Sequence, residues 1–239
     1  SSKGCPLKCI YCDVQQKIFN FKTPERVVEE FQELIKYGAT SIHILDDAFN
    51  IRKERVSAIS KAIVENKIDV DWSARGTVEI REKVISDLAA AGCKRLHVGI
   101  ESLDDDILAY FKKSCRYEHI KKFCELCRKY GIDVLGYFIL GAPGESEEYR
   151  KALPQMISDL GIRLPYFNIL SPLAETPYYD MLLKDGAFDR DYWAEFCRQP
   201  EKDFIMPDVR PIEEHEMLNN TVQEYIGFFK RQDAQVWVT

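Results

Sequence analysis

The chain has 239 residues, of which 46% are hydrophobic, so it can bury the core of one α/β domain. Its net charge of −6 argues against a nucleic-acid-binding protein, which would carry a basic patch or stripe. Eight cysteines are too few for a disulfide scaffold, no apolar run approaches the ~20 residues of a membrane span, and no signal-peptide pattern opens the chain, so we expect a cytoplasmic protein.

Three cysteines, Cys5, Cys9 and Cys12, fall within eight residues near the start of the chain, and we refer to residues 4–12 as the cysteine loop. Gly4 and Pro6 shape the backbone here, so the loop can bring three thiolates onto one iron–sulfur cluster. Three ligands are one short of the usual four-cysteine set, which would leave one iron without a protein ligand. An open coordination position is typical of a catalytic metal site, whereas structural sites are normally closed.

Two other interpretations of these cysteines stay open. Cys9 and Cys12 have the spacing of a zinc-binding pair, and the thiols of an intracellular protein need not bind any metal. No histidine lies at a short spacing that would complete a zinc site; the four histidines are His43, His97, His119 and His215. The sequence therefore favours the iron–sulfur cluster.

Beyond the cysteine loop, helical stripes of apolar residues alternate with short β-like runs. Thr23 and Pro24 predict an N-cap and a first helical position, and the helix that follows is expected to end near Gly38. The runs predicted as strands are 41–45, 70–74, 95–100, 134–140 and 166–170. Apolar stripes predict further helices around residues 56–63, 84–89, 120–127 and 156–160.

The predicted strand ends, at 47, 75, 101, 140 and 171, are separated by 28, 26, 39 and 31 residues. One βαβ unit takes about 30 residues, so this rhythm predicts a parallel sheet with helices outside it. A further strand should lead into the cysteine loop, and none precedes it. We therefore expect the chain to be a segment of a longer polypeptide.

The pattern changes after about Leu173, and we expect a core over residues 1–172 and an extension over 173–239. Within the extension, Glu175 to Leu183 predicts a short helix and Glu213 to Lys230 a final one. Residues 184–212 are predicted to be irregular, because glycine and prolines interrupt them. We expect the extension to cover an edge of the sheet or to shape a substrate entrance.

Polar residues and one glycine stand at the predicted strand ends: Asp46, Asp47, Arg75, Glu101, Ser102 and Gly141. In barrels of parallel strands, active sites are built from residues at these ends. Burial of an unpaired charge is costly, so the charged members need partners. A salt bridge or an N-cap would explain any one of these charged residues taken alone. Polar residues at the ends of several successive strands, however, predict a ligand site.

The cysteine spacing, with Tyr11 directly before the last cysteine, resembles the signature of the radical S-adenosylmethionine (radical SAM) superfamily. Gly-Ile-Glu-Ser-Leu-Asp at 99–104 and Phe-Ile-Leu-Gly-Ala-Pro-Gly-Glu at 138–145 are also similar to segments of that family, and the likeness spans roughly residues 4–185. The resemblance implies a partial (β/α)6 TIM-like barrel of parallel strands, its first strand missing from the chain, with an irregular and helical C-terminal extension.

The resemblance also implies a reaction. Cys5, Cys9 and Cys12 would bind a 4Fe–4S cluster, and SAM would chelate the open iron through its methionine part. The reduced cluster would split SAM to methionine and a 5′-deoxyadenosyl radical, which abstracts hydrogen from a small-molecule or peptide substrate. An electron donor such as flavodoxin or ferredoxin would be needed as a partner.

The residues implied to contact SAM are Tyr11, Asp46, Asp47, Arg75, Glu101, Ser102, Gly141, Gly144, Leu170 and Ser171. The two aspartates stand where the family usually has a Gly-Gly-Glu-like motif that holds the SAM amino group. Arg75 would bind the SAM carboxylate, and Glu101 with Ser102 the ribose hydroxyls. The later residues would line the adenine, with Tyr11 stacking nearby. No further catalytic residue is assigned.

The aspartate pair in place of Gly-Gly-Glu, followed by Phe49, resembles the cobalamin-dependent subclass of the family. That subclass implies cobalamin as a further cofactor and a transferase reaction, methyl transfer to an unactivated carbon, or a related radical cyclisation. A cobalamin-independent oxidoreductase or methylthiotransferase stays open as a competing interpretation. A non-catalytic iron–sulfur or zinc protein is the alternative from another functional class.

Overall fold

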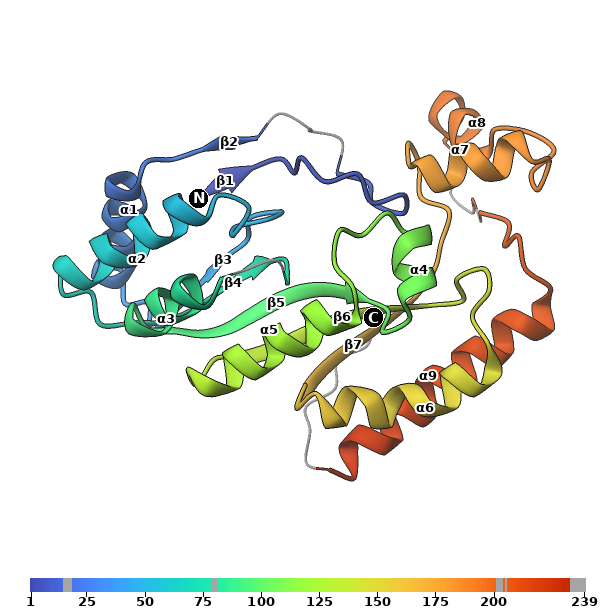
Figure 1. The fold of residues 1–239 in the computed structure, drawn as a ribbon. Coiled ribbons are helices and arrows are strands. Elements are labelled where there is room, and N and C mark those ends of the chain that lie inside the picture. Colours follow the sequence, from blue (N-terminus) through green and yellow to red (C-terminus); the bar gives the residue numbers. More distant parts are fainter. Residues whose placement is uncertain (15–18, 79–80, 201–203, 205, 233–239) are drawn as a thin grey trace.

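The computed structural model describes residues 1–14, 19–78, 81–200, 204 and 206–232 of the chain. Its centre is a five-stranded sheet in the order β3-β4-β5-β6-β7, in which every neighbouring pair is parallel (Figure 1). The strands are β3 (Ser41–Ile44), β4 (Asp71–Gly76), β5 (Cys93–Glu101), β6 (Asp133–Leu140) and β7 (Leu164–Ile169). All five strands predicted from the sequence are present, and their parallel order confirms the predicted fold class.

Five of the described helices cover one face of the sheet: one precedes β3, and the others lie between successive strands. They are α1 (Pro24–Lys36), α2 (Lys53–Glu65), α3 (Glu82–Ala90), α5 (Tyr117–Lys129) and α6 (Glu147–Asp159). Figure 1 shows α1, α2, α3 and α5 in succession along the sheet, as the pairwise contacts of these helices require. The helix predicted after Thr23 begins as expected, because the Thr23 side chain accepts a hydrogen bond from the amide of Arg26 and Pro24 occupies the first turn.

The two faces of the sheet differ in polarity because side chains alternate along each strand. Trp72, Leu96 and Phe138 point to the helix-covered face and are at most 1% exposed. On the opposite face lie polar and aromatic side chains that are partly or fully exposed: His43, Ser73, Arg75, His97, Tyr137 and Tyr166. One face therefore forms the core with the helices, and the other is open to a ligand.

Three small elements were not predicted. The strands β1 (Ser2–Lys3) and β2 (Asn20–Phe21) pair antiparallel on either side of the cysteine loop. The short helix α4 (Asp105–Tyr110) follows β5, and the Asp104 carboxylate caps it by accepting hydrogen bonds from the amides of Asp106 and Ile107. These elements place Phe111, at the end of α4, beside the cysteine loop.

The C-terminal extension contains α7 (Pro177–Lys184), α8 (Tyr192–Arg198) and α9 (Ile212–Lys230). The first and last were predicted, but the prediction that 184–212 is irregular throughout is wrong, because α8 lies within it. The Asp191 carboxylate caps α8 by accepting from the Ala194 amide, and the rings of Trp193 and Phe196 pack with Phe204. Helix α9 packs on α6 and β7, while the division at residue 172 stays a prediction.

No described helix is long and apolar enough to cross a membrane.

Candidate functional site

Contacts from three parts of the chain hold the cysteine loop beside the C-terminal end of the sheet. The Gly4 amide donates to the Asp47 carboxylate, just after β3, at 2.9 Å. The Ile10 amide donates to the carbonyl of Phe111 at 3.3 Å, and the Tyr178 amide of α7 donates to the carbonyl of Ile10 at 2.9 Å. Ile10 is 1% exposed and packs in one apolar cluster with Phe111 and Tyr178. The loop is therefore fixed by the sheet, by α4 and by the extension.

The three thiols of this loop differ in exposure. Cys5 and Cys9 are each 9% exposed, and Cys12 is partly exposed. Burial first, and then the neighbouring groups Cys9, Asp13 and Cys5, raise the pKa of the Cys12 thiol. All eight cysteines lie in the described part of the chain, and none of them forms a disulfide.

This donor set fits a 4Fe–4S cluster better than a single ion. Within the described residues, no three His, Cys, Asp or Glu side chains converge so as to hold one metal ion. Each cysteine ligand of a 4Fe–4S cluster binds a different iron, so the thiols can surround the cluster without meeting at one point. A zinc ion needs its ligands at one tetrahedral centre, and the geometry gives that interpretation no support.

The two aspartates that follow β3 have different environments. Asp46 is 1% exposed. Its carboxylate accepts hydrogen bonds from the hydroxyls of Ser1 and Ser2, each at 2.6 Å, and from the Ser2 amide at 2.8 Å. Asp47 is exposed, and only one of its oxygens has a hydrogen-bond partner among the described residues. Asp47 is thus the better placed of the two to accept from an added ammonium group.

Glu101 ends β5 in an unusual conformation. Its φ of 69° is in the left-handed region, and the register of β5 with β6 shifts between Gly99 and Glu101. The carboxylate is buried and accepts a hydrogen bond from the Tyr11 hydroxyl at 2.7 Å. Left-handed backbone at a buried non-glycine residue is costly and persists where surrounding contacts hold it, which marks functional sites.

Lys113 is a buried cation on the other side of Glu101. Its ammonium nitrogen lies 3.6 Å from Oε1 of Glu101 and donates to the Gly99 carbonyl at 2.7 Å. Burial alone would lower the pKa of Lys113, but neighbouring negative groups, Glu101 first and Cys9 next, raise it. Together with Cys9, Lys113 lines a cavity of about 250 Å³ beside the cysteine loop.

Ser102 has a different environment from Glu101. It is 2% exposed, its hydroxyl is 2.8 Å from the hydroxyl of Tyr149, and it accepts from the Asp104 amide at 3.1 Å. The Tyr149 hydroxyl also accepts from the Leu103 amide at 2.8 Å. These contacts connect α6 to the β5–α4 turn and already use the Ser102 hydroxyl, whose assignment to the SAM ribose stays a prediction.

Arg75 lies on the open face of the sheet. It is exposed, and no ion pair to it is present in the described ranges. The histidines His43 and His97 are close by, with ring centroids 4.5 Å apart, and His43 Nδ1 is hydrogen-bonded to the Ser73 hydroxyl at 2.6 Å. Burial first, then His43, Arg95 and Arg75, lower the pKa of His97 from 6.5 to about 4. An unpaired guanidinium beside neutral imidazoles suits a carboxylate ligand.

The residues implied for the adenine lie at the ends of β6 and β7. Gly141 has φ 80°, and its amide donates to the Glu145 carboxylate at 3.1 Å. A Cβ at Gly141 would lie 2.8 Å from a guanidinium nitrogen of Arg210, so the extension reaches this strand end. The Leu170 amide continues the sheet by donating to the Leu140 carbonyl, whereas Ser171 is exposed. Gly144 also has positive φ, at 84°.

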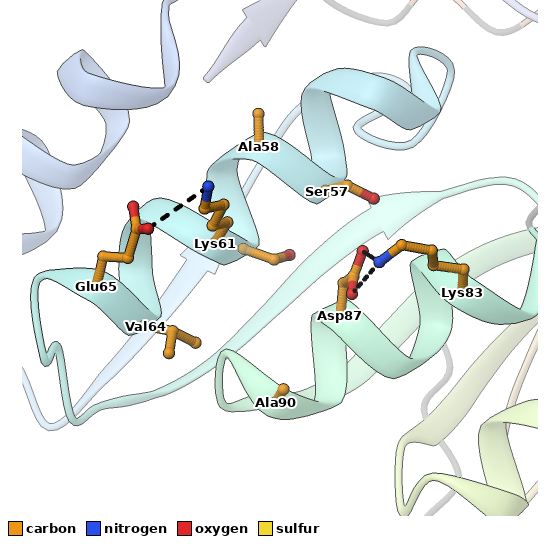
Figure 2. A pocket seen from close by; sticks show the side chains of 9 residues that line it. Ser57, Ala58, Lys61, Val64, Glu65, Lys83, Asp87 and Ala90 are labelled. Carbon is orange, nitrogen blue, oxygen red and sulfur yellow. Dashed lines mark hydrogen bonds and ion pairs between the residues drawn. The ribbon is translucent and has the colours of Figure 1, made fainter.

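A second hollow lies on the outer side of the sheet and does not share any implied site residue. Figure 2 shows this groove of about 530 Å³ between α2 and α3. Its charged side chains pair with each other, Lys61 with Glu65 at 3.6 Å and Lys83 with Asp87 at 2.9 Å. The groove therefore offers no uncompensated charge to a ligand.

Three residues of the site region were missed in the sequence. Lys113 and Tyr149 contact the β5 end from other elements, and the buried Asn50 holds the end of β4. The Asn50 side chain donates to the Thr77 carbonyl at 2.7 Å and accepts from the Thr77 amide at 2.8 Å. The one available signal was the position of Asn50 directly after the Asp-Asp-Ala-Phe segment.

A family model described as the Radical SAM superfamily matches residues 1–157. The chain belongs to the radical SAM superfamily. Membership confirms the family expected from the cysteine spacing, and it means that the 4Fe–4S cluster and SAM are the cofactors to which the site residues must be fitted.

Two curated relatives of this radical SAM chain are methyltransferases by name. It is 29% identical over 201 residues to the uncharacterized methyltransferase PH0819 of Pyrococcus horikoshii, covering 82% of this chain and 44% of that protein. It is 29% identical over 189 residues to the bacteriochlorophyllide d C-12(1)-methyltransferase of Chlorobaculum tepidum, covering 75% and 41%. The chain thus spans less than half the length of these relatives.

A solved radical SAM structure shares the fold. The radical SAM methyltransferase TsrM from Kitasatospora setae, solved with cobalamin and a 4Fe–4S cluster bound, superposes with a TM-score of 0.70. The match covers 78% of this chain and 39% of TsrM at 22% sequence identity. At this identity the likeness shows the fold, and it agrees with the partial barrel expected from the sequence.

Proposed function

We propose that this chain carries the radical SAM chemistry of a cobalamin-dependent methyltransferase. One observation carries the proposal: three thiols in one anchored loop, one ligand short of a full set, with Tyr11 of that loop bonded to the buried carboxylate of Glu101. The names of the relatives support methyl transfer, and the cobalamin bound in TsrM supports that cofactor. The aspartate pair after β3 is consistent with the same subclass.

The chain's own residues would have separate tasks in this reaction. Cys5, Cys9 and Cys12 would hold the cluster, which together with SAM supplies a 5′-deoxyadenosyl radical for hydrogen abstraction. Asp47 would accept from the SAM amino group. Arg75, which has no ion pair within the described ranges and lies on the open face, would bind the SAM carboxylate.

The nucleoside part of SAM would be bound at the next strand ends. Glu101 would accept from the ribose hydroxyls, and Gly141, Leu170 and Ser171 would border the adenine. Tyr11 would sit between the ribose site and the cluster, because its hydroxyl is already bonded to Glu101. The open polar face of the sheet below these residues would receive the substrate.

Partners and compartment follow from this chemistry. The cluster must receive one electron for each SAM cleaved, so we propose a flavodoxin or ferredoxin as donor. The substrate would be a small molecule or a peptide, and TsrM, solved with tryptophan, gives a precedent for a small molecule in a similar fold. The cytoplasm is the proposed compartment, since it suits an oxygen-sensitive cluster.

The test compares Cys9→Ala with Cys197→Ala after anaerobic reconstitution with iron and sulfide. Cys197 is exposed on α8, remote in sequence from the cysteine loop, and serves as the matched control. With SAM and dithionite, the parent and Cys197→Ala should form 5′-deoxyadenosine, and Cys9→Ala should form none. Unchanged formation by Cys9→Ala would contradict the cluster assignment.

The cobalamin part has its own readout. Adding methylcobalamin, dithionite and candidate acceptors should give a methylated product. Methyl transfer to a substrate radical would leave cob(II)alamin, which would need one further electron from dithionite before SAM could remethylate it and leave S-adenosylhomocysteine. Formation of 5′-deoxyadenosine without any dependence on cobalamin would favour the cobalamin-independent interpretation. Bound iron and sulfide with no SAM cleavage would favour a non-catalytic iron–sulfur protein, and bound zinc alone would contradict both.

A further inference from the structure

Lys113 is a buried charge that none of the tasks above uses. Only 10% of its side chain is exposed, and it stands in the turn between α4 and α5, remote in the chain from the cysteines. The backbone directs it inward. The Lys113 amide donates to the Leu108 carbonyl at 2.9 Å, and Lys112 before it has a positive φ of 55°. A buried ammonium is costly unless it is paired and hydrogen-bonded, so its partners indicate its role.

Both partners of Lys113 belong to the end of β5. The ammonium donates to the Gly99 carbonyl at 2.7 Å and approaches Oε1 of Glu101 to 3.6 Å. Position 99 must be glycine for this arrangement, because a Cβ there would lie 2.2 Å from Oε1 of Glu101. The Glu101 carboxylate is therefore folded back over Gly99, and Lys113 fixes it there.

The two oxygens of Glu101 are used unequally. Tyr11 donates to Oε1 at 2.7 Å, and Oε1 is also the oxygen nearest Lys113. Oε2 has no hydrogen-bond donor within the part of the chain that the structure describes. Two groups thus hold one oxygen, while the second is left to accept from a ligand. Such an arrangement orients a carboxylate before the ligand arrives.

We propose that Lys113 is a positioning residue that presents Oε2 of Glu101 to the ribose hydroxyls of SAM. This role rests on the proposed function, and it concerns the nucleoside half of SAM alone. It requires that loss of Lys113 weakens SAM binding through Glu101 and leaves the methionine half, bound at the iron, Asp47 and Arg75, unaffected.

The test is a double-mutant cycle on the anaerobic, cluster-loaded protein, with Lys113→Met, Glu101→Gln and both changes together. Calorimetry measures the Kd of SAM and of free methionine for each protein. Lys113→Met should weaken SAM binding about tenfold. The double variant should bind SAM no more weakly than Glu101→Gln alone, since the two residues act as one unit. Methionine affinity and iron content should stay at the parent values in all three.

Lys112→Met is the matched control, because Lys112 is an exposed neighbour with no ion pair among the described residues. It should bind SAM as the parent does. If Lys113→Met does not fold, Lys113→Gln replaces it in the cycle, and the same selective loss of SAM affinity is expected.

The outcomes separate this role from the proposed function. Additive losses in the cycle, or an equal loss of methionine affinity, would overturn the role of Lys113 while the parent still binds both ligands. A cluster-loaded parent that binds neither SAM nor methionine would overturn the proposed function and this role with it.

Discussion

The Tyr11 hydroxyl donates a 2.7 Å hydrogen bond to the carboxylate of Glu101, 90 positions further along the chain. This bond joins the cysteine loop to the end of β5, so the two implied cofactor sites form one structural unit. Tyr11 also packs edge-on against Phe111, with ring centroids 5.0 Å apart. The aromatic residue before the last cysteine therefore acts through its hydroxyl as well as its ring.

Replacing Tyr11 by Phe removes that bond and keeps the ring packing. One hydrogen bond to a charged group contributes about 1.5–3 kcal/mol, and Lys113 still holds the carboxylate, so we expect SAM binding to weaken about threefold to tenfold. Calorimetry on the cluster-loaded protein measures the change, and iron content should not alter. Tyr110→Phe is the control, since its ring is also in contact with Phe111. An equal loss in both variants would contradict a role for the Tyr11 hydroxyl.

Asp46 and Asp47 should respond in opposite ways to replacement by Ala. Asp46→Ala leaves the Ser1 and Ser2 donors without their buried acceptor, at a cost of about 2–4 kcal/mol of unfolding free energy. Asp47→Ala removes an exposed carboxylate and should cost less than about 1 kcal/mol. Binding of methionine to the cluster-loaded protein should weaken only in Asp47→Ala.

Urea unfolding and calorimetry on both variants give the two readouts. If Asp46→Ala were as stable as the parent and also lost methionine affinity, the assignment of the two carboxylates would be reversed.

The sheet could be predicted from the sequence because its signal is local. Each strand is a short apolar run that stops at a polar residue or glycine, and the spacing of about 30 residues implies parallel order. Helix α4 has six residues and β1 and β2 have two each. Elements this short contain too few residues to show a periodic pattern of apolar side chains. Helix α8 was missed because the nearby glycine and prolines outweighed a capping aspartate and three aromatic rings.

Only those residues of the site that stand at the ends of strands could be predicted from the sequence. The sequence could not show that Asp46 and Asp47 have different roles. The serines that donate hydrogen bonds to Asp46 lie 44 and 45 positions away in the chain. Lys113 has no local pattern to mark it, because its partners Gly99 and Glu101 are brought to it by the turn after α4. Contacts of this kind depend on tertiary structure, which spacing does not encode.

Asn50→Ala should destabilise the end of β4. The change removes both hydrogen bonds with the Thr77 backbone in a position that is 1% exposed, so we expect a loss of about 2–4 kcal/mol in unfolding free energy. Asn66→Ala is the matched control: its side chain also bonds a carbonyl, that of Ala62, but it is exposed. Urea denaturation should show Asn66→Ala within about 0.5 kcal/mol of the parent. Equal stabilities for the two variants would show that the two hydrogen bonds between Asn50 and the Thr77 backbone do not stabilise the fold.

His97 should make stability depend on pH. Burial and the neighbouring His43 and arginines lower its pKa from 6.5 to about 4 in the folded protein, whereas the unfolded chain binds the proton near 6.5. Above pH 6.5 neither state is protonated and the full stability is present. As pH falls from 6.5 towards 4, the unfolded state takes up the proton first, and stability is lost.

Below about pH 4 the folded state is protonated as well, so His97 causes no further loss. Because the side chain is partly exposed, solvent screening reduces the effect to about 1–2 kcal/mol. His97→Gln removes this titration, so between pH 6.5 and 4 the parent should lose about 1–2 kcal/mol more than the variant in urea unfolding. Parallel stability curves for the two proteins over that range would show that His97 titrates alike in both states, and would contradict the neutral imidazole on the open face of the sheet.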